Sequence, residues 1–282
     1  MKFKYLIIAF SIIIIIIILV TAFLPLTFAS ALSKSSPETI SNFRLITIPL
    51  LIFMVLLLGG MGIFFFLNYR LLSLLEREDW PALAYYLEQK IYTKGDYSSR
   101  NVRLLASSYL VITDYQSVIK LEGKTMIARP ASVIKNILVF GSARVLSGDH
   151  AEAAAFYSAL LIKGKGKLKP GEEQWARWYH GFSLLLKGAF REAEPEFGAL
   201  AASSKDALIT GLSAYFLDSS IAKNSGDKAA CLASAEKGKE RVVRALKNSG
   251  SWKKEVAKNG SDIHIAIIKK YIDETGLWIY KK

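Results

Sequence analysis

Residues 148–153 read Gly-Asp-His-Ala-Glu-Ala, and residues 188–193 read Gly-Ala-Phe-Arg-Glu-Ala. Each block joins a turn to the polar and small residues that begin a helix. Three further blocks, at 78–83, 113–118 and 226–231, align with these two. The third residues of the five blocks lie 35, 35, 40 and 38 residues apart, at Trp80, Tyr115, His150, Phe190 and Lys228. A period of this length indicates a stack of equivalent units, each too small to bury its own apolar face.

The sequence around these blocks has the periodicity of helices. After Arg70, apolar residues recur at three- and four-residue spacing with little strict alternation, and the breaks carry Gly, Asp, Asn or Ser. This pattern is typical of amphipathic helices separated by short turns. We therefore expect an all-α chain.

The blocks resemble the turn and second-helix start of the tetratricopeptide repeat, whose unit is a helix hairpin of about 34 residues. The resemblance extends to small residues where the two helices of a hairpin touch, to aromatic residues on the second helix, and to a proline that ends it: Ala106, Gly141, Gly181, Ala153, Ala193, Tyr157, Phe197 and Pro130. It implies a tetratricopeptide-like α-solenoid over residues 71–282, clearest at 99–203, with atypical units at both ends. Another all-helical bundle is the alternative.

Residues 1–70 predict a membrane hairpin. Apolar stretches at 5–24 and 46–67 are each long enough to cross a hydrocarbon core of roughly 30 Å as a helix. A short polar connection that contains Ser33–Glu38 separates them. A cleavable secretory signal is the competing interpretation of the first stretch, because two lysines precede it and Ala29-Ser30-Ala31 follows it.

Positive charge favours one topology for this hairpin. Five basic residues flank the two stretches on the outer sides, at Lys2, Lys4, Arg70, Arg77 and Lys90, against Lys34 and Arg44 between them. Basic residues concentrate on the cytoplasmic side of membrane proteins. We expect an integral protein of a bacterial inner membrane, with residues 71–282 in the cytoplasm.

An inserted loop lengthens the interval between the third and fourth blocks. It carries four lysines, Lys163, Lys165, Lys167 and Lys169. The plain interpretation is a solvated turn. The functional one is contact with anionic lipid headgroups or with an acidic partner, since the domain is expected to be tethered to a membrane.

An aromatic cluster is the most distinctive local feature. Trp175, Trp178 and Phe182 recur at three- and four-residue spacing and so share one face of a helix. By the tetratricopeptide resemblance, this face turns toward a concave groove, and the same register in earlier units carries Arg100, Arg103 and Lys135. Such a groove would suit a peptide with acidic and apolar residues. The alternative is that the aromatic residues are core between hairpins.

The chain offers little for catalysis or cofactor binding. Its one cysteine and three histidines, Cys231, His150, His180 and His264, are far apart in sequence, and no nucleophile–base pair or paired carboxylates stand out. We therefore expect no enzyme activity, cofactor or metal. A net charge of +13 invites nucleic acid as a partner, but the lysines are dispersed and no nucleic-acid motif is present.

These observations favour a membrane-anchored helical-repeat scaffold that binds other proteins or assembles a membrane complex. The rival is an accessory subunit of a membrane enzyme, transporter or envelope or motor assembly, with a mainly structural role. Partners are then other proteins and the lipid bilayer, and a homo-oligomer is an open alternative.

Overall fold

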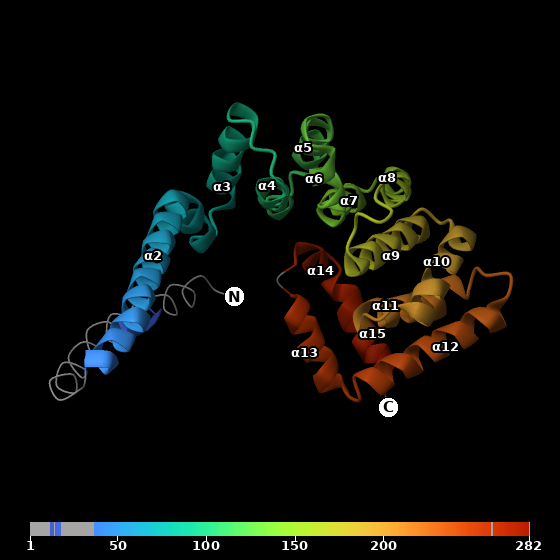
Figure 1. Ribbon diagram of the computed structural model, residues 1–282. Helices are drawn as coiled ribbons and strands as arrows, with labels where there is room; N and C mark the ends of the chain where they lie inside the picture. Colours follow the sequence, from blue (N-terminus) through green and yellow to red (C-terminus); the bar gives the residue numbers. More distant parts are fainter. Residues whose placement is uncertain (1–11, 14, 18–36, 261, 282) are drawn as a thin grey trace. The chain divides into compact units, whose positions relative to one another are not determined.

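The computed structural model describes residues 12–13, 15–17, 37–260 and 262–281, and within these ranges every regular element is helical (Figure 1). The all-α prediction is confirmed to that extent. The elements are α2 (Pro37–Glu76), α3 (Trp80–Glu88), η1 (Gln89–Thr93), α4 (Ser99–Val111), α5 (Tyr115–Ala128), α6 (Pro130–Ile134), α7 (Ile137–Leu146), α8 (His150–Lys163), α9 (Pro170–Leu186), α10 (Phe190–Ser203), α11 (Ala207–Phe216), η2 (Leu217–Ile221), α12 (Lys228–Ala245), α13 (Ser249–Asn259), α14 (Ile263–Ile267) and α15 (Lys269–Tyr280). The elements η1 and η2 are single π-helical turns.

The chain divides into two compact units, Met1–Leu83 and Ala84–Lys282. The sequence predicts a boundary at residue 70, where the charge content rises. Helix α2 continues as one helix through that point to Glu76.

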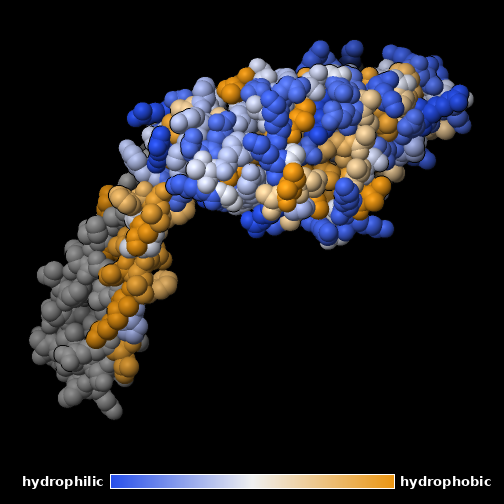
Figure 2. Space-filling view, turned by 90° about the horizontal axis from the view of Figure 1, so that it is seen from above, coloured by the Kyte–Doolittle hydropathy of each residue, from blue (hydrophilic) through white to orange (hydrophobic). Residues whose placement is uncertain are grey.

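Helix α2 contains the second predicted span. Its segment from Ile48 to Glu76 is long and apolar enough to cross a membrane, and its side chains are mostly exposed, as the orange surface of this helix in Figure 2 shows. Among the described residues, this is the one helix with these properties. The first predicted span, 5–24, lies mostly outside the described residues. Part of the predicted polar connection belongs to α2, because this helix already begins at Pro37.

The second unit is built on a repeated turn. Thr113, Gly148 and Gly188 adopt positive φ angles of 60°, 85° and 82°, each two residues before the start of a helix. In each, the backbone N–H donates to the carbonyl three residues earlier, as in Schellman helix ends. Helices α5, α8 and α10 therefore follow their predecessors through the same tight reversal, and each begins within its block, at Tyr115, His150 and Phe190.

Aspartates cap the starts of α5, α8 and α12. The carboxylates of Asp114, Asp149 and Asp227 accept hydrogen bonds from the backbone N–H three residues on, at 3.1, 2.9 and 2.9 Å. Each bond satisfies a donor that a helix start leaves unpaired. Ala189 has no side chain that can do this, and α10 starts without a cap.

Consecutive helices pack in chain order. The pairs α4–α5, α7–α8, α9–α10 and α11–α12 contact one another as hairpins, and α7 contacts α9, which in turn contacts α11. Helices α7, α9 and α11 thus form one continuous surface, here called the inner face. Figure 1 draws α14 and α15, in red, beside it.

Glycines permit close approach inside three hairpins. A Cβ on Gly141 would overlap the Tyr157 ring, one on Gly181 would lie 3.2 Å from the Cβ of Glu196, and one on Gly238 would lie 2.9 Å from the Cβ of Ala214. The first two were expected as hairpin contacts from the sequence. Helix–helix packing at this distance leaves no room for a side chain.

We predict that Gly141→Ala lowers the unfolding free energy of the full chain by about 1–3 kcal/mol, since the Tyr157 ring is fully buried and cannot move away. The matched control is Gly123→Ala in α5, where a Cβ would meet nothing within 4 Å and should stabilise the helix by roughly 0.5–1 kcal/mol. Thermal unfolding in mild detergent measures both. Equal melting temperatures for the two variants would contradict the assigned hairpin contact.

Candidate functional site

The three predicted groove aromatics lie on α9 and are buried. Trp178 is inaccessible to solvent, and Trp175 and Phe182 are 7% and 3% exposed. The rings of Trp178 and Phe182 stack with centroids 5.0 Å apart. Phe216 of α11 adjoins this stack, at 5.5 Å from Phe182. The structure therefore brings the aromatic side chains together, but none of them faces solvent.

The C-terminal segment covers them. The Tyr179 hydroxyl donates to the carbonyl oxygen of His264 at 2.7 Å, and the His264 ring meets the Trp175 ring edge to face at 5.1 Å. Farther along, Tyr271 of α15 lies 5.3 Å from Phe182. The inner face expected to receive a partner peptide is thus filled by α14 and α15 of the same chain.

Polar contacts hold α15 at its far end. The indole N–H of Trp278 donates to Asp218 at 2.9 Å, and the Tyr215 hydroxyl donates to Glu274 at 3.2 Å. Asp218 lies in the π-helical turn η2, which displaces the backbone at the end of α11. The covering role of this segment was not predicted, because residues 249–282 match none of the five blocks.

The predicted basic residues of the groove have different surroundings. Arg103 donates to the side chain of Asn136 at 3.0 Å and to the carbonyl of Lys135 at 3.1 Å. Arg100 and Lys135 have exposed side chains. The positive charge of Arg103 also contributes to lowering the pKa of His264.

Burial makes His264 a neutral histidine. Its pKa falls to about 4, chiefly because the imidazolium would lose its hydration and secondarily because Arg103 repels it. Its Nδ1 is buried without a hydrogen-bond partner in the described part of the chain. A charged ring here would work against the docking of α14.

A buried ion pair that sequence reasoning missed connects α5 with α7. Arg144 contacts Glu122 at 2.5 Å and Glu152 at 3.2 Å, and its guanidinium lies over the Phe156 ring at 4.3 Å from the centroid. Burial raises the pKa of Glu122, while Arg144 opposes that rise. Removal of one partner from such a pair is destabilising, because it leaves the other charge buried without compensation. Nothing in the local sequence distinguishes these charges from exposed ones.

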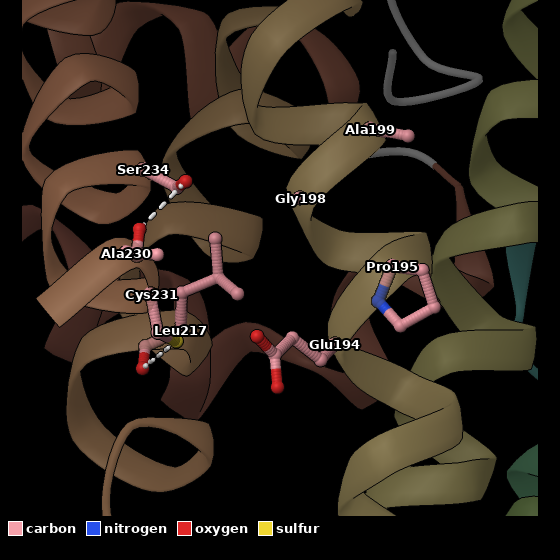
Figure 3. A pocket seen from close by; sticks show the side chains of 8 residues that line it. All are labelled: Glu194, Pro195, Gly198, Ala199, Leu217, Ala230, Cys231 and Ser234. Carbon is pink, nitrogen blue, oxygen red and sulfur yellow. Dashed lines mark hydrogen bonds between the residues drawn. The ribbon is translucent and has the colours of Figure 1, made fainter. Parts of the chain in front are cut away.

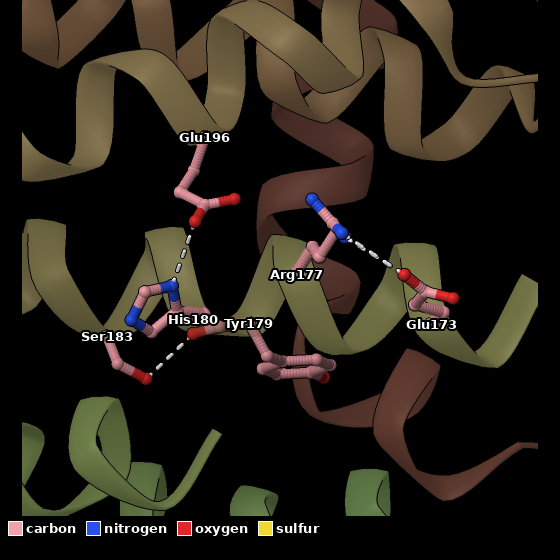
Figure 4. A network of polar contacts seen from close by, with 6 residues as sticks. All are labelled: Glu173, Arg177, Tyr179, His180, Ser183 and Glu196. Carbon is pink, nitrogen blue, oxygen red and sulfur yellow. Dashed lines mark hydrogen bonds and ion pairs between the residues drawn. The ribbon is translucent and has the colours of Figure 1, made fainter. Parts of the chain in front are cut away.

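His180 forms the most enzyme-like polar contact. Its Nδ1 lies 3.2 Å from a Glu196 carboxylate oxygen, as Figure 4 shows. Ser183, one turn away, donates its hydroxyl to the Tyr179 carbonyl at 2.7 Å rather than to His180. A general base needs its nucleophile within hydrogen-bond reach. This arrangement holds α9 to α10 and presents no activated hydroxyl.

A shallow pocket of about 270 Å³ lies between α10, η2 and α12 (Figure 3). Cys231 lines it, with its thiol donating to the Leu217 carbonyl at 3.4 Å. Burial raises the pKa of this thiol to about 11, which leaves it protonated and a weak nucleophile at neutral pH. Within the described ranges, no group of three His, Cys, Asp or Glu side chains is placed to hold a metal ion.

The four loop lysines are exposed between α8 and α9. Gly166 takes a positive φ of 74°, and the backbone N–H of Lys167 donates to the Gly164 carbonyl at 2.8 Å. Leu168 is buried. The loop is therefore a folded turn that directs its lysines outward.

Residues 117–281 match the sequence family described as "Uncharacterised Treponema protein". This match spans more than half of the chain, and the chain belongs to this family. An uncharacterized protein of Treponema pallidum (strain Nichols) is 32% identical over 150 residues, which are 53% of this chain and 46% of the relative. The chain thus spans about half the length of the curated relative it matches. The family match includes both α9 and the C-terminal segment that covers it.

We predict that acidification weakens this packing through His264. The folded pKa of about 4 lies below the ordinary value of 6.5, so the unfolded chain binds the extra proton. Unfolding free energy should therefore fall as pH drops from about 6.5 toward 4, by about 1 kcal/mol per pH unit from this group. In His264→Phe this contribution should vanish.

Denaturant unfolding followed by tryptophan fluorescence measures the slope, with His150→Gln as the matched histidine replacement. Identical pH slopes for the parent and His264→Phe would show that His264 does not titrate in this way.

Proposed function

We propose that the chain is a membrane-anchored helical-repeat scaffold that assembles other proteins at a bacterial inner membrane. The observation that carries this proposal is the inner face, which accepts a helical segment along α9 and α11. A surface built to seat one amphipathic helix can seat another of similar pattern. No catalytic activity, cofactor or nucleic-acid partner is part of the proposal.

The finer architecture belongs to the same proposal. Four turns share a left-handed residue two positions before a helix, at Glu78, Thr113, Gly148 and Gly188. The hairpins they join pack in chain order. Both features support a tetratricopeptide-like solenoid, in which a long concave surface arises from stacking.

The anchor consists of α2 together with a first span at 5–24. Helix α2 supports it through an exposed apolar surface that water would not favour on a free helix. With both spans in the bilayer, residues 71–282 lie in the cytoplasm.

A mainly structural accessory role is the second candidate. The filled inner face favours it, because a groove that its own chain occupies is closed to other ligands until α15 leaves. In that case α14 and α15 are permanent parts of the core, and contacts with a larger membrane assembly, or with further copies of the chain, use other surfaces.

Membrane topology is tested by cysteine labelling in a Cys231→Ala background. Ser35→Cys should react with an impermeant thiol reagent added outside intact cells, whereas Lys281→Cys should react only after the cells are opened. Labelling of Lys281→Cys in intact cells would reverse the proposed arrangement.

The two functional candidates predict opposite responses to Tyr271→Ala, which loosens α15 from Phe182 and Phe216. A scaffold should recover more partner from mild detergent, because a larger fraction of the chain has its inner face open. A structural subunit should recover less. The matched control is Leu277→Ala on the same helix, since Leu277 is 72% exposed. Unchanged recovery with Tyr271→Ala would contradict both the binding role of the inner face and the core role of α15.

A further inference from the structure

Two isoleucines stand out on the surface of the second unit. Ile127 and Ile162 retain 89% and 75% of their exposure, the two largest values among the apolar side chains of this unit. Each is the twelfth residue after the start of its helix, α5 at Tyr115 and α8 at His150. They therefore occupy equivalent positions at the ends of successive second helices of the hairpins.

The segments that follow these isoleucines meet. A Cβ on Gly164, the residue that ends α8, would lie 3.3 Å from the Ile134 side chain of α6, and α6 follows α5 directly. Leu168 packs against the same point and holds the loop in place. The loop after α8 thus lies against the end of α6, the short helix that follows α5. The surface formed by the ends of α5 and α8 and these following segments is here called the α5/α8 edge.

Basic residues predominate at this edge, although the Glu172 carboxylate lies beside the loop and accepts a hydrogen bond from the backbone N–H of Lys169 at 3.4 Å. Residues 123–134 contain Lys124 and Arg129, residues 153–171 contain four lysines, and neither segment contains an acidic residue. Glu122, just before the first segment, is buried against Arg144. In the described part of the chain, none of the four loop lysines has a carboxylate within ion-pair distance. Their charge is available to an external anion.

We propose that the α5/α8 edge rests on the surface of an anionic phospholipid bilayer, with Ile127 and Ile162 inserted at the headgroup level and the loop lysines over the phosphates. Exposed aliphatic side chains beside basic residues are what an interfacial contact requires. Long lysine stems allow the ammonium groups to reach the phosphates while the apolar atoms stay below. Exposed apolar side chains and basic residues occur together at this edge. A loop that only contacts solvent would not need the exposed isoleucines.

The proposal rests on the proposed function, since the membrane anchor brings the bilayer within reach. Each lysine beside an anionic leaflet strengthens attachment by about fivefold, with strong dependence on salt. Contact should therefore need anionic lipid and weaken as ionic strength rises.

The test uses the full chain in a Cys231→Ala background, in nanodiscs of phosphatidylcholine alone or with phosphatidylglycerol. A fluorophore on Ile162→Cys should be quenched by spin-labelled lipid severalfold more with phosphatidylglycerol than without it, and 0.5 M salt should remove most of the difference. The matched control is Ala202→Cys, the twelfth residue from the start of α10 and also exposed, which should be quenched little in either lipid. Replacing Lys163, Lys165 and Lys167 by Gln should abolish the quenching at Ile162→Cys.

Equal quenching at the two positions would overturn the proposal. So would a label that responds to added polyglutamate and not to lipid, an outcome that would assign the edge to an acidic protein. Failure of the chain to enter nanodiscs would count against the anchor alone. The same labelled chain is then mixed with preformed phosphatidylglycerol vesicles, where quenching at Ile162→Cys supports the edge and its absence refutes it.

Discussion

Burial of the α9 aromatic side chains beneath α14 and α15 is the interaction on which the second unit depends. Trp178 has no exposed surface, and the ring of Phe182 packs against that of Tyr271, which lies almost ninety residues later in the chain. Burial of large aromatic side chains is among the strongest favourable terms in folding. An array of hairpins stabilised only by its neighbours would leave this row of rings in water; the C-terminal segment closes it and converts an open array into a unit with its own core.

The covering of the inner face by α14 and α15 bears directly on the proposed function. If the inner face binds a partner as proposed, an external helix must compete with an intramolecular segment that is present at high effective concentration. A partner must bind the open state considerably better than the closed one to gain access. Among the described side chains, the His180 contact presents no activated hydroxyl, and burial keeps the Cys231 thiol protonated.

The sequence predicted the local features of the fold well. Asp114, Asp149 and Gly188 mark turns whose hydrogen bonds involve residues at most five positions apart, and the following helices begin where the blocks placed them. Such signals are local, and the physical reason for each lies in the block itself. The sequence also predicted that Gly141 lies where two helices of a hairpin touch, because such a close contact requires a small residue.

The tertiary structure alone decided which surfaces are covered. A tryptophan at helical spacing has the same sequence signature in a groove and in a core, and only the packing of His264 and Tyr271 shows that Trp178 lies inside. The pairing of Arg144 with Glu122 and the junction between Gly164 and Ile134 are likewise contacts between separate elements. Periodicity determines which residues share a face of a helix, but what that face meets depends on contacts distant in sequence, which no local pattern encodes.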